Sequence, residues 1–168
     1  MPDLPFLAAA FAPTARTYCD FVAAFAELER AEFLAGALPL LARTYAEVSA
    51  WPPSREIDAP MLDPGARPPA VRDELDEFLG VTQHHGRIFD PFEPDPKVVE
   101  YSVAADLSDV RDDLLDGLRI LDAGHPAAAL WHWRFNFEVH WGYHATAALR
   151  AIHALGSHHT EFWFGPDD

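Results

Sequence analysis

Residues 126–155 read PAAALWHWRFNFEVHWGYHATAALRAIHAL, and this stretch decides the fold. On a helical wheel its apolar side chains cover almost the whole circumference. The polar positions form only a narrow edge, made of His132, Asn136, Tyr143 and Arg150. A helix that is apolar nearly all round is a buried one. We therefore predict a long central helix near the C-terminus of an all-α domain.

One charged residue interrupts the apolar surface of this predicted helix. Glu138 falls on the same face as Trp131, Phe135 and Gly142, and a carboxylate in apolar surroundings needs a partner. Arg134 lies one turn earlier, but Arg before Glu is the weaker order for such a pair. We therefore expect a further partner from a neighbouring helix. Gly142 costs about 1 kcal/mol in a helix interior, which close approach of another helix would explain.

The composition describes one acidic globular domain that spans residues 1–168. The chain carries 27 acidic and 12 basic side chains, a formal net charge of −15, and 49% of its residues are hydrophobic. This charge opposes binding to nucleic acid or to anionic membranes, because both depend on cationic side chains. It suits a basic protein partner or a divalent cation.

The N-terminus and the single cysteine carry no sign of export. The first residues, MPDLPF, lack the cationic region of a secretory signal, and no segment is apolar for long enough to span a membrane. Cys19 lies in an apolar helical run and has no partner for an internal disulfide. We predict a cytoplasmic protein in which Cys19 is a buried, inert thiol.

Periodicity divides the remaining chain into about five or six helices. Two antiparallel helices are expected in the first fifty residues, the first beginning at Pro13 and the second kinked or split at Pro39. Ser102 is a suitable N-cap for a strong helix. The other expected segments are a proline-rich connector that wraps the outside (51–69), a short helix (70–79), a short helix or turn (81–92), the Ser102 helix (103–123) and an aromatic tail (156–168).

Acidic residues follow one edge of the predicted Ser102 helix. Asp106, Asp109, Asp113 and Asp116 lie on this edge beside a seam of leucines. Carboxylates clustered at a helix–helix border are what a hard cation such as Mg²⁺ or Mn²⁺ requires. The alternative is a solvated acidic face, with the first two residues placed near the positive end of the helix dipole.

A second acidic pattern is looser. Glu74 and Glu77 are three residues apart, as are Asp106 and Asp109. All-α nucleoside-triphosphate pyrophosphohydrolases hold Mg²⁺ with paired acidic motifs of this general type. Here the second pair is aspartate, and two such pairs arise easily by chance in an acidic chain.

His140 and His144 are four residues apart, a spacing able to chelate zinc from one helix face. A third ligand would come from His84, His85 or an aspartate of the acidic edge. The other interpretation of His144 is a hydrogen-bonded core histidine. No cofactor is expected other than a possible divalent metal (Mg, Mn or Zn), with Asp106, Asp109, Asp113, His140 and His144 as its candidate ligands.

Two segments resemble the bacterial proteins grouped as domain-of-unknown-function family 5063. They are residues 106–114 (DLSDVRDDL) and 123–145 (AGHPAAALWHWRFNFEVHWGYHA), with weaker likeness around Tyr18-Cys19, Phe33-Leu34, Tyr45 and Phe89. The likeness extends over most of the chain. It implies an all-helical, cytoplasmic bacterial protein and supplies no reaction or catalytic residue.

The tight turn before Pro126 makes the last two helices antiparallel. We therefore predict a buried polar network that joins Arg134 and Glu138 to the edge carrying Asp109 and Asp113, together with His144.

Two functions remain open. The first is a non-catalytic interaction module with an acidic surface, which meets a basic partner or associates with itself through the tail. The second is a divalent-metal-dependent phosphoester or nucleotide hydrolase that uses Asp106, Asp109 and Asp113 with Glu138 or His144. In the first the carboxylates pair with arginines or face solvent, whereas in the second they converge on a pocket. The sequence contains no catalytic motif, which favours the first.

Overall fold

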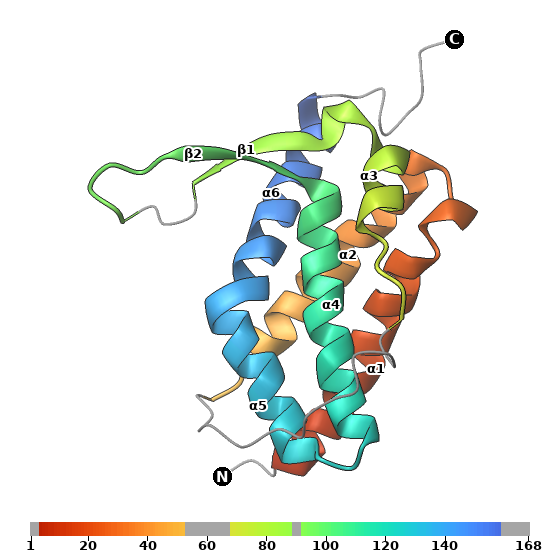
Figure 1. The fold of residues 1–168 in the computed structure, drawn as a ribbon, viewed down its shortest axis with the longest axis vertical. Coiled ribbons are helices and arrows are strands. Elements are labelled where there is room, and N and C mark those ends of the chain that lie inside the picture. Colours follow the sequence, from red (N-terminus) through yellow and green to blue (C-terminus); the bar gives the residue numbers. More distant parts are fainter. Residues whose placement is uncertain (1–3, 53–67, 89–91, 159–168) are drawn as a thin grey trace.

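The computed structural model describes residues 4–52, 68–88 and 92–158, and helices account for most of this part of the chain, as predicted (Figure 1). Two long N-terminal helices, α1 (Leu4–Ala23) and α2 (Arg30–Ser49), are joined through a 3₁₀ turn (Phe25–Glu27). The later helices are α3 (Arg72–Leu79), α4 (Val103–Asp122), α5 (Pro126–Asn136) and α6 (Gly142–His158). No described helix combines the length and the apolar composition that crossing a bilayer requires.

Helix α4 is the element around which the others pack. It contacts α1, α3, α5 and α6, and Figure 1 shows it running through the middle of the bundle. Its start is confirmed, because the Ser102 hydroxyl accepts a hydrogen bond of 3.1 Å from the Ala105 amide. Gly124, at a positive φ of 88°, ends the turn into α5.

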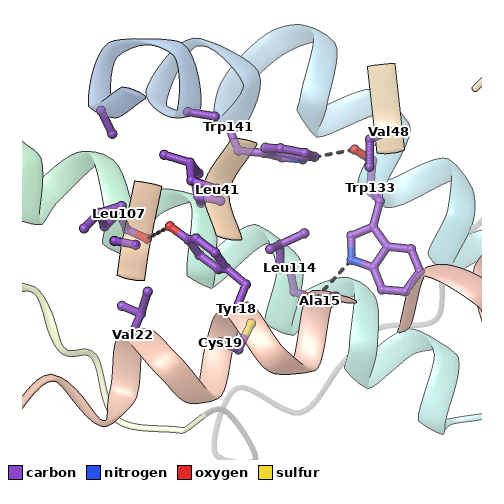
Figure 2. Packing of buried hydrophobic residues seen from close by; sticks show 14 of the residues in the cluster. Ala15, Tyr18, Cys19, Val22, Leu41, Val48, Leu107, Leu114, Trp133 and Trp141 are labelled. Carbon is purple, nitrogen blue, oxygen red and sulfur yellow. Dashed lines mark hydrogen bonds between the residues drawn. The ribbon is translucent and has the colours of Figure 1, made fainter. Parts of the chain in front are cut away.

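The core holds two tryptophans that satisfy their indole N–H groups on backbone carbonyls (Figure 2). Trp133 donates to the carbonyl of Leu114 on α4, and Trp141 donates to the carbonyl of Trp133, both at 3.1 Å. Gly117 allows the first contact, because a Cβ at this position would overlap the Trp133 indole. Close helix approach therefore occurs at Gly117, and the prediction that placed it at Gly142 was wrong.

Neither internal proline ends a helix. Pro13 lies inside α1, which begins at Leu4, and Pro39 lies inside α2, which is not split. The prediction of a helix start at Pro13 was therefore wrong. Of the two alternatives for Pro39, a kink or a split, the continuous helix excludes the split. An internal proline costs about 3 kcal/mol. Buried side chains on both sides of each proline, such as Phe11 before Pro13 and Leu41 after Pro39, offset that cost by packing.

Residues 84–88 and 98–102 form the two strands of a β-hairpin that the sequence did not predict. Strand β1 (His84–Ile88) follows a 3₁₀ turn (Val81–Gln83) and pairs antiparallel with β2 (Val98–Ser102). The hairpin projects from one end of the bundle (Figure 1). The helix or turn expected over 81–92 is thus a strand for most of its described length. The side chains that point inward from this strand are the polar His85 and Arg87. The sequence therefore lacks the apolar alternation that would have predicted a strand.

The predicted long helix is continuous over 126–158 but contains a π turn, Phe137–Trp141, between α5 and α6. A π turn inserts an extra residue and rotates the helix surface that follows. Consequently Trp133 and Trp141, eight residues apart, both face the core. Gly142 closes this turn, because a Cβ there would clash with the carbonyl oxygen of Phe137.

The π turn also corrects the predicted apolar face around Glu138. Trp131 and Phe135 stack on each other with ring centroids 5.1 Å apart, and Phe135 is 44% exposed. The Glu138 side chain is 50% exposed. These residues lie on the solvent side of the helix and not in the core. Most of the proline-rich connector and the aromatic tail lies outside the described residues.

Cys19 provides a test of the core around α1. The thiol is 3% exposed and lies 3.6 Å from the carbonyl oxygen of Arg111. Burial raises its pKa to about 12, so the thiolate that reacts with disulfide reagents is nearly absent at mildly alkaline pH. We expect native protein to react with an aromatic disulfide reagent only as fast as it unfolds, and denatured protein to react at once. Rapid stoichiometric labelling of native protein would contradict this packing.

Candidate functional site

Asp106 links the hairpin to two helices. Its side chain, on α4, is fully buried. One carboxylate oxygen lies 2.9 Å from Nε2 of His85, and the other lies 3.0 Å from Nη1 of Arg87 and 2.8 Å from Nδ1 of His144. The first two partners belong to β1 and the third to α6. This buried charge is thereby matched by a guanidinium and by imidazole nitrogens.

The contacts of Asp106 fix the orientation of His144. Nδ1 of His144 lies 2.8 Å from the Asp106 oxygen, 3.3 Å from Nη1 of Arg87 and 3.5 Å from a carboxylate oxygen of Asp109. A proton on Nδ1 is donated to the nearer of the two carboxylate oxygens, that of Asp106. In the tautomer with its proton on Nδ1, an imidazole has its lone pair on Nε2. His144 is 3% exposed, and its ring lies 5.4 Å from that of Tyr101 on β2.

His140, one turn earlier, has the same arrangement with another aspartate. Its Nδ1 lies 2.7 Å from a carboxylate oxygen of Asp113. Burial raises the pKa of Asp113, and the hydrogen bond from His140 opposes that rise. The imidazole is 46% exposed, so this end of the site reaches the surface. The two histidine rings meet edge to face, with centroids 4.8 Å apart.

Asp109 completes a group of three possible metal ligands. One ligand atom from each of Asp109, His140 and His144 lies within 4.8 Å of the other two. Bonds of the length that zinc forms in a tetrahedral site place ligand atoms roughly 3.4 Å apart, so the group would contract slightly around an ion. Asp109 also forms an ion pair with Arg72 at the start of α3.

The hairpin contributes an aromatic wall to the same site. The guanidinium of Arg87 lies over the ring of Tyr101, 4.4 Å from its centroid. Burial raises the pKa of the Tyr101 hydroxyl, and the nearby charge of Asp109 adds to the rise. Tyr101 is therefore a neutral phenol across the physiological range.

The structure brings five of the sequence-predicted residues together between α4 and α6: Asp106, Asp109, Asp113, His140 and His144. It places the remaining acidic candidates elsewhere. Asp116 pairs with Arg119 on the same helix at 2.9 Å. Glu74 and Glu77, on α3, contribute no ligand to the group of three.

The predicted network that joined Arg134 and Glu138 to these aspartates was wrong. Nε of Arg134 donates to Glu138 over 2.9 Å, and its Nη1 donates to the carbonyl of Val48 on α2. Because of the π turn, Arg134 points in a different direction from His140 and His144. The simple intrahelical pair is the arrangement present.

Three residues of the site were missed by sequence reasoning: Arg72, Arg87 and Tyr101. The hairpin register places Tyr101 opposite His85, and Arg87 lies two residues further along the same face. The sequence did contain a signal for the hairpin: histidine and arginine at alternate positions, followed by the β-branched pair Val98-Val99. This signal can be recognised only once the pairing of the two strands is known.

Comparisons with known proteins identify a family and a fold. A family model described as "Domain of unknown function (DUF5063)" matches residues 3–158. A crystal structure of protein BF1032 from Bacteroides fragilis is similar, with 19% sequence identity and a TM-score of 0.69. The match covers 86% of this chain and 89% of that one. At this identity the likeness concerns the fold alone. No curated protein matches the sequence.

Proposed function

Given that the chain belongs to the DUF5063 family of domains of unknown function, we propose that it binds a divalent metal ion through Asp109, His140 and His144. The observation that carries the proposal is the pair of aspartates behind the two histidines. Nδ1 of each histidine lies against an aspartate, Asp106 or Asp113, and with the proton there each Nε2 would have the lone pair for an ion. Nδ1 of His144 also lies 3.5 Å from Asp109. Histidines that bind metals almost always donate their other N–H in this way.

The ligand types favour zinc or a similar transition metal over magnesium. Two imidazoles and one carboxylate suit Zn²⁺, whereas Mg²⁺ prefers oxygen ligands and retained water. Three protein ligands also leave a position for water, as in catalytic zinc sites. A hydrolytic reaction on a phosphoester is therefore the activity to screen once binding is established. Glu138 is not the base of such a reaction in this proposal, because it pairs with Arg134.

Arg72 should weaken metal binding, because its guanidinium already forms an ion pair with the proposed ligand Asp109. A metal must share or displace this contact. Replacement of Arg72 by glutamine should therefore increase zinc affinity, by about tenfold if it removes some 1.4 kcal/mol of competition. An increase in zinc affinity in this variant would indicate that Asp109 is a metal ligand and that its role is not purely structural.

The test is thermal unfolding of chelator-treated protein, titrated with Zn²⁺, Mn²⁺ and Mg²⁺ at fixed ionic strength. A ligand present at a hundred times its Kd adds about 2.7 kcal/mol, which raises the Tm of a chain of this size by roughly 5–10 °C. We expect a saturable rise with Zn²⁺ that is lost in Asp109→Asn and His140→Gln.

His153→Gln is the matched control, because this histidine is exposed on α6 and contributes no ligand to the group. It should titrate like the unmodified protein. Equal shifts in Asp109→Asn and the unmodified protein, or no shift beyond that of inert salt, would exclude this metal site.

A non-catalytic interaction module is the second candidate, and different observations favour it. Arg72 and Arg87 pair with Asp109 and Asp106, and the hairpin exposes Val98 by 68% and Val99 by 45%. Exposed aliphatic side chains on a two-stranded sheet suit strand pairing with a second copy. Sedimentation velocity should then detect a concentration-dependent dimer that Val98→Lys abolishes. A monomer at every concentration would rule out this form of association.

A further inference from the structure

A groove lies between β1 and α6, lined in part by His85 and Arg87, which contact Asp106. Its volume is about 620 Å³, within the range of roughly 300–1,000 Å³ found for small-molecule sites. Ala147, Ala151 and Ala154 of α6 line it on one side, and Gly86 and Ile88 of β1 on the other. The short alanine side chains, spaced along one helix face, give the groove its depth.

The polar side chains that line the groove are either basic or uncharged. Arg87, Arg150 and His85 line it, and none of the described lining residues carries a carboxylate. In a chain of net charge −15, a described lining without a carboxylate is a distinct feature, although Asp106 lies behind it, against Arg87 and His85. Within the described part of the chain, no acidic side chain forms an ion pair with Arg150, which is exposed at the groove.

The hairpin holds one of these cations rigidly. Arg87 is 8% exposed, rests on the Tyr101 ring and donates to Asp106. His85 is held by the other oxygen of the same carboxylate. A ligand that meets these groups would find them already ordered, which lowers the entropy cost of binding. Arg150, in contrast, is exposed and able to adjust to the ligand.

We propose that this groove binds a small organic anion, with its carboxylate or phosphate at Arg150 and Arg87 and its apolar body over the alanines of α6. Guanidinium groups match both anions through paired hydrogen bonds. An apolar pocket with a few fixed polar groups is the usual form of a small-molecule site. None of the three proposed metal ligands lines the groove, although Arg87 lies 3.3 Å from Nδ1 of His144. The presence of a chelator in the test below therefore keeps the two proposals distinguishable.

The test uses three eight-carbon probes that differ only in their head group: octanoate, octyl phosphate and octanol. Each competes with anilinonaphthalene sulfonate, followed by fluorescence, in the presence of a chelator. We expect at least one of the two anions to compete saturably at a single site, and octanol to compete about tenfold less strongly, as for one charge-assisted contact. The better of the two anions identifies the head group.

Two variants locate the site on the molecule. Arg150→Gln should weaken the better anion about tenfold and leave octanol unchanged, whereas Ala147→Leu should fill the groove and weaken every probe. Arg43→Gln is the matched control, because Arg43 pairs with Glu47 on α2 and does not line the groove. Equal competition by octanoate, octyl phosphate and octanol, or an Arg150→Gln variant with unchanged anion affinity, would overturn the proposal. Competition without saturation would overturn it as well.

Discussion

Replacement of Trp133 by alanine should lower the free energy of unfolding by about 3–5 kcal/mol. The indole is fully buried, and it packs edge-on against Phe11 with ring centroids 5.0 Å apart. Its removal leaves a cavity where α1, α4 and α5 meet and strips the Leu114 carbonyl of its donor. Domains of this kind have a total stability of about 5–15 kcal/mol, so the loss is a large share. Urea unfolding followed by far-ultraviolet circular dichroism measures it.

Trp131→Ala is the matched control on the same helix. Trp131 is half-buried and stacks on the exposed Phe135, so its removal should cost clearly less than that of Trp133. A second arm tests the contact with Gly117. Gly117→Ala alone should cost about 1–3 kcal/mol through overpacking. Combined with Trp133→Ala, it should add almost nothing, because the clash has disappeared. Additive losses would show that the two residues do not share this contact.

Asp106→Asn should destabilise the protein by about 3–5 kcal/mol, since it removes the negative charge that Asp106 places against the buried Arg87. The change preserves side-chain volume, so packing contributes little to the loss. Asp106 joins β1, α4 and α6. Relative to the unmodified protein, the substitution should therefore accelerate hydrogen exchange more at the hairpin amides than at those of α1. Urea unfolding and hydrogen exchange provide the two measurements.

Asp122→Asn is the control for loss of charge alone. Asp122 pairs with Arg16 at the surface, where the two side chains are 56% and 48% exposed, and such a pair contributes about 0–1 kcal/mol. The double variant Asp106→Leu with Arg87→Met should recover much of the lost stability, because replacing a whole buried pair by apolar side chains is often neutral. If Asp106→Asn unfolds like the unmodified protein, the carboxylate is not the link between hairpin and helices.

Local rules predicted the helices well, because caps and periodicity act over a few residues. Ser102, the Gly124–Pro126 junction and the leucine seam of α4 each fixed a boundary or a face. The prolines failed as boundary signals, since tertiary packing around Phe11 and Leu41 outweighs a local backbone cost.

The hairpin and the π turn were beyond the reach of the sequence for different reasons. A strand whose inward side chains are His85 and Arg87 has no apolar alternation, and its meaning depends on pairing with residues 98–102. The π turn shifts the phase of a helix that is apolar nearly all round, so no position in the sequence marks the shift. The aspartates and histidines of the site were identifiable by type, but Arg72, Arg87 and Tyr101 depend on long-range contacts.

The π turn makes the length of one short segment critical. Each residue of an α-helix turns the chain by roughly 100°. The π turn accommodates one extra residue, so removing one residue between 137 and 141 would convert the segment to regular α-helix and keep His144 facing Asp106, whereas adding one would rotate α6 and carry His144 away. A chimera or homology model that treats residues 126–158 as uninterrupted α-helix would place every later side chain one position out of register. The orientation of α6 therefore tolerates a shortening of this segment by one residue but not a lengthening.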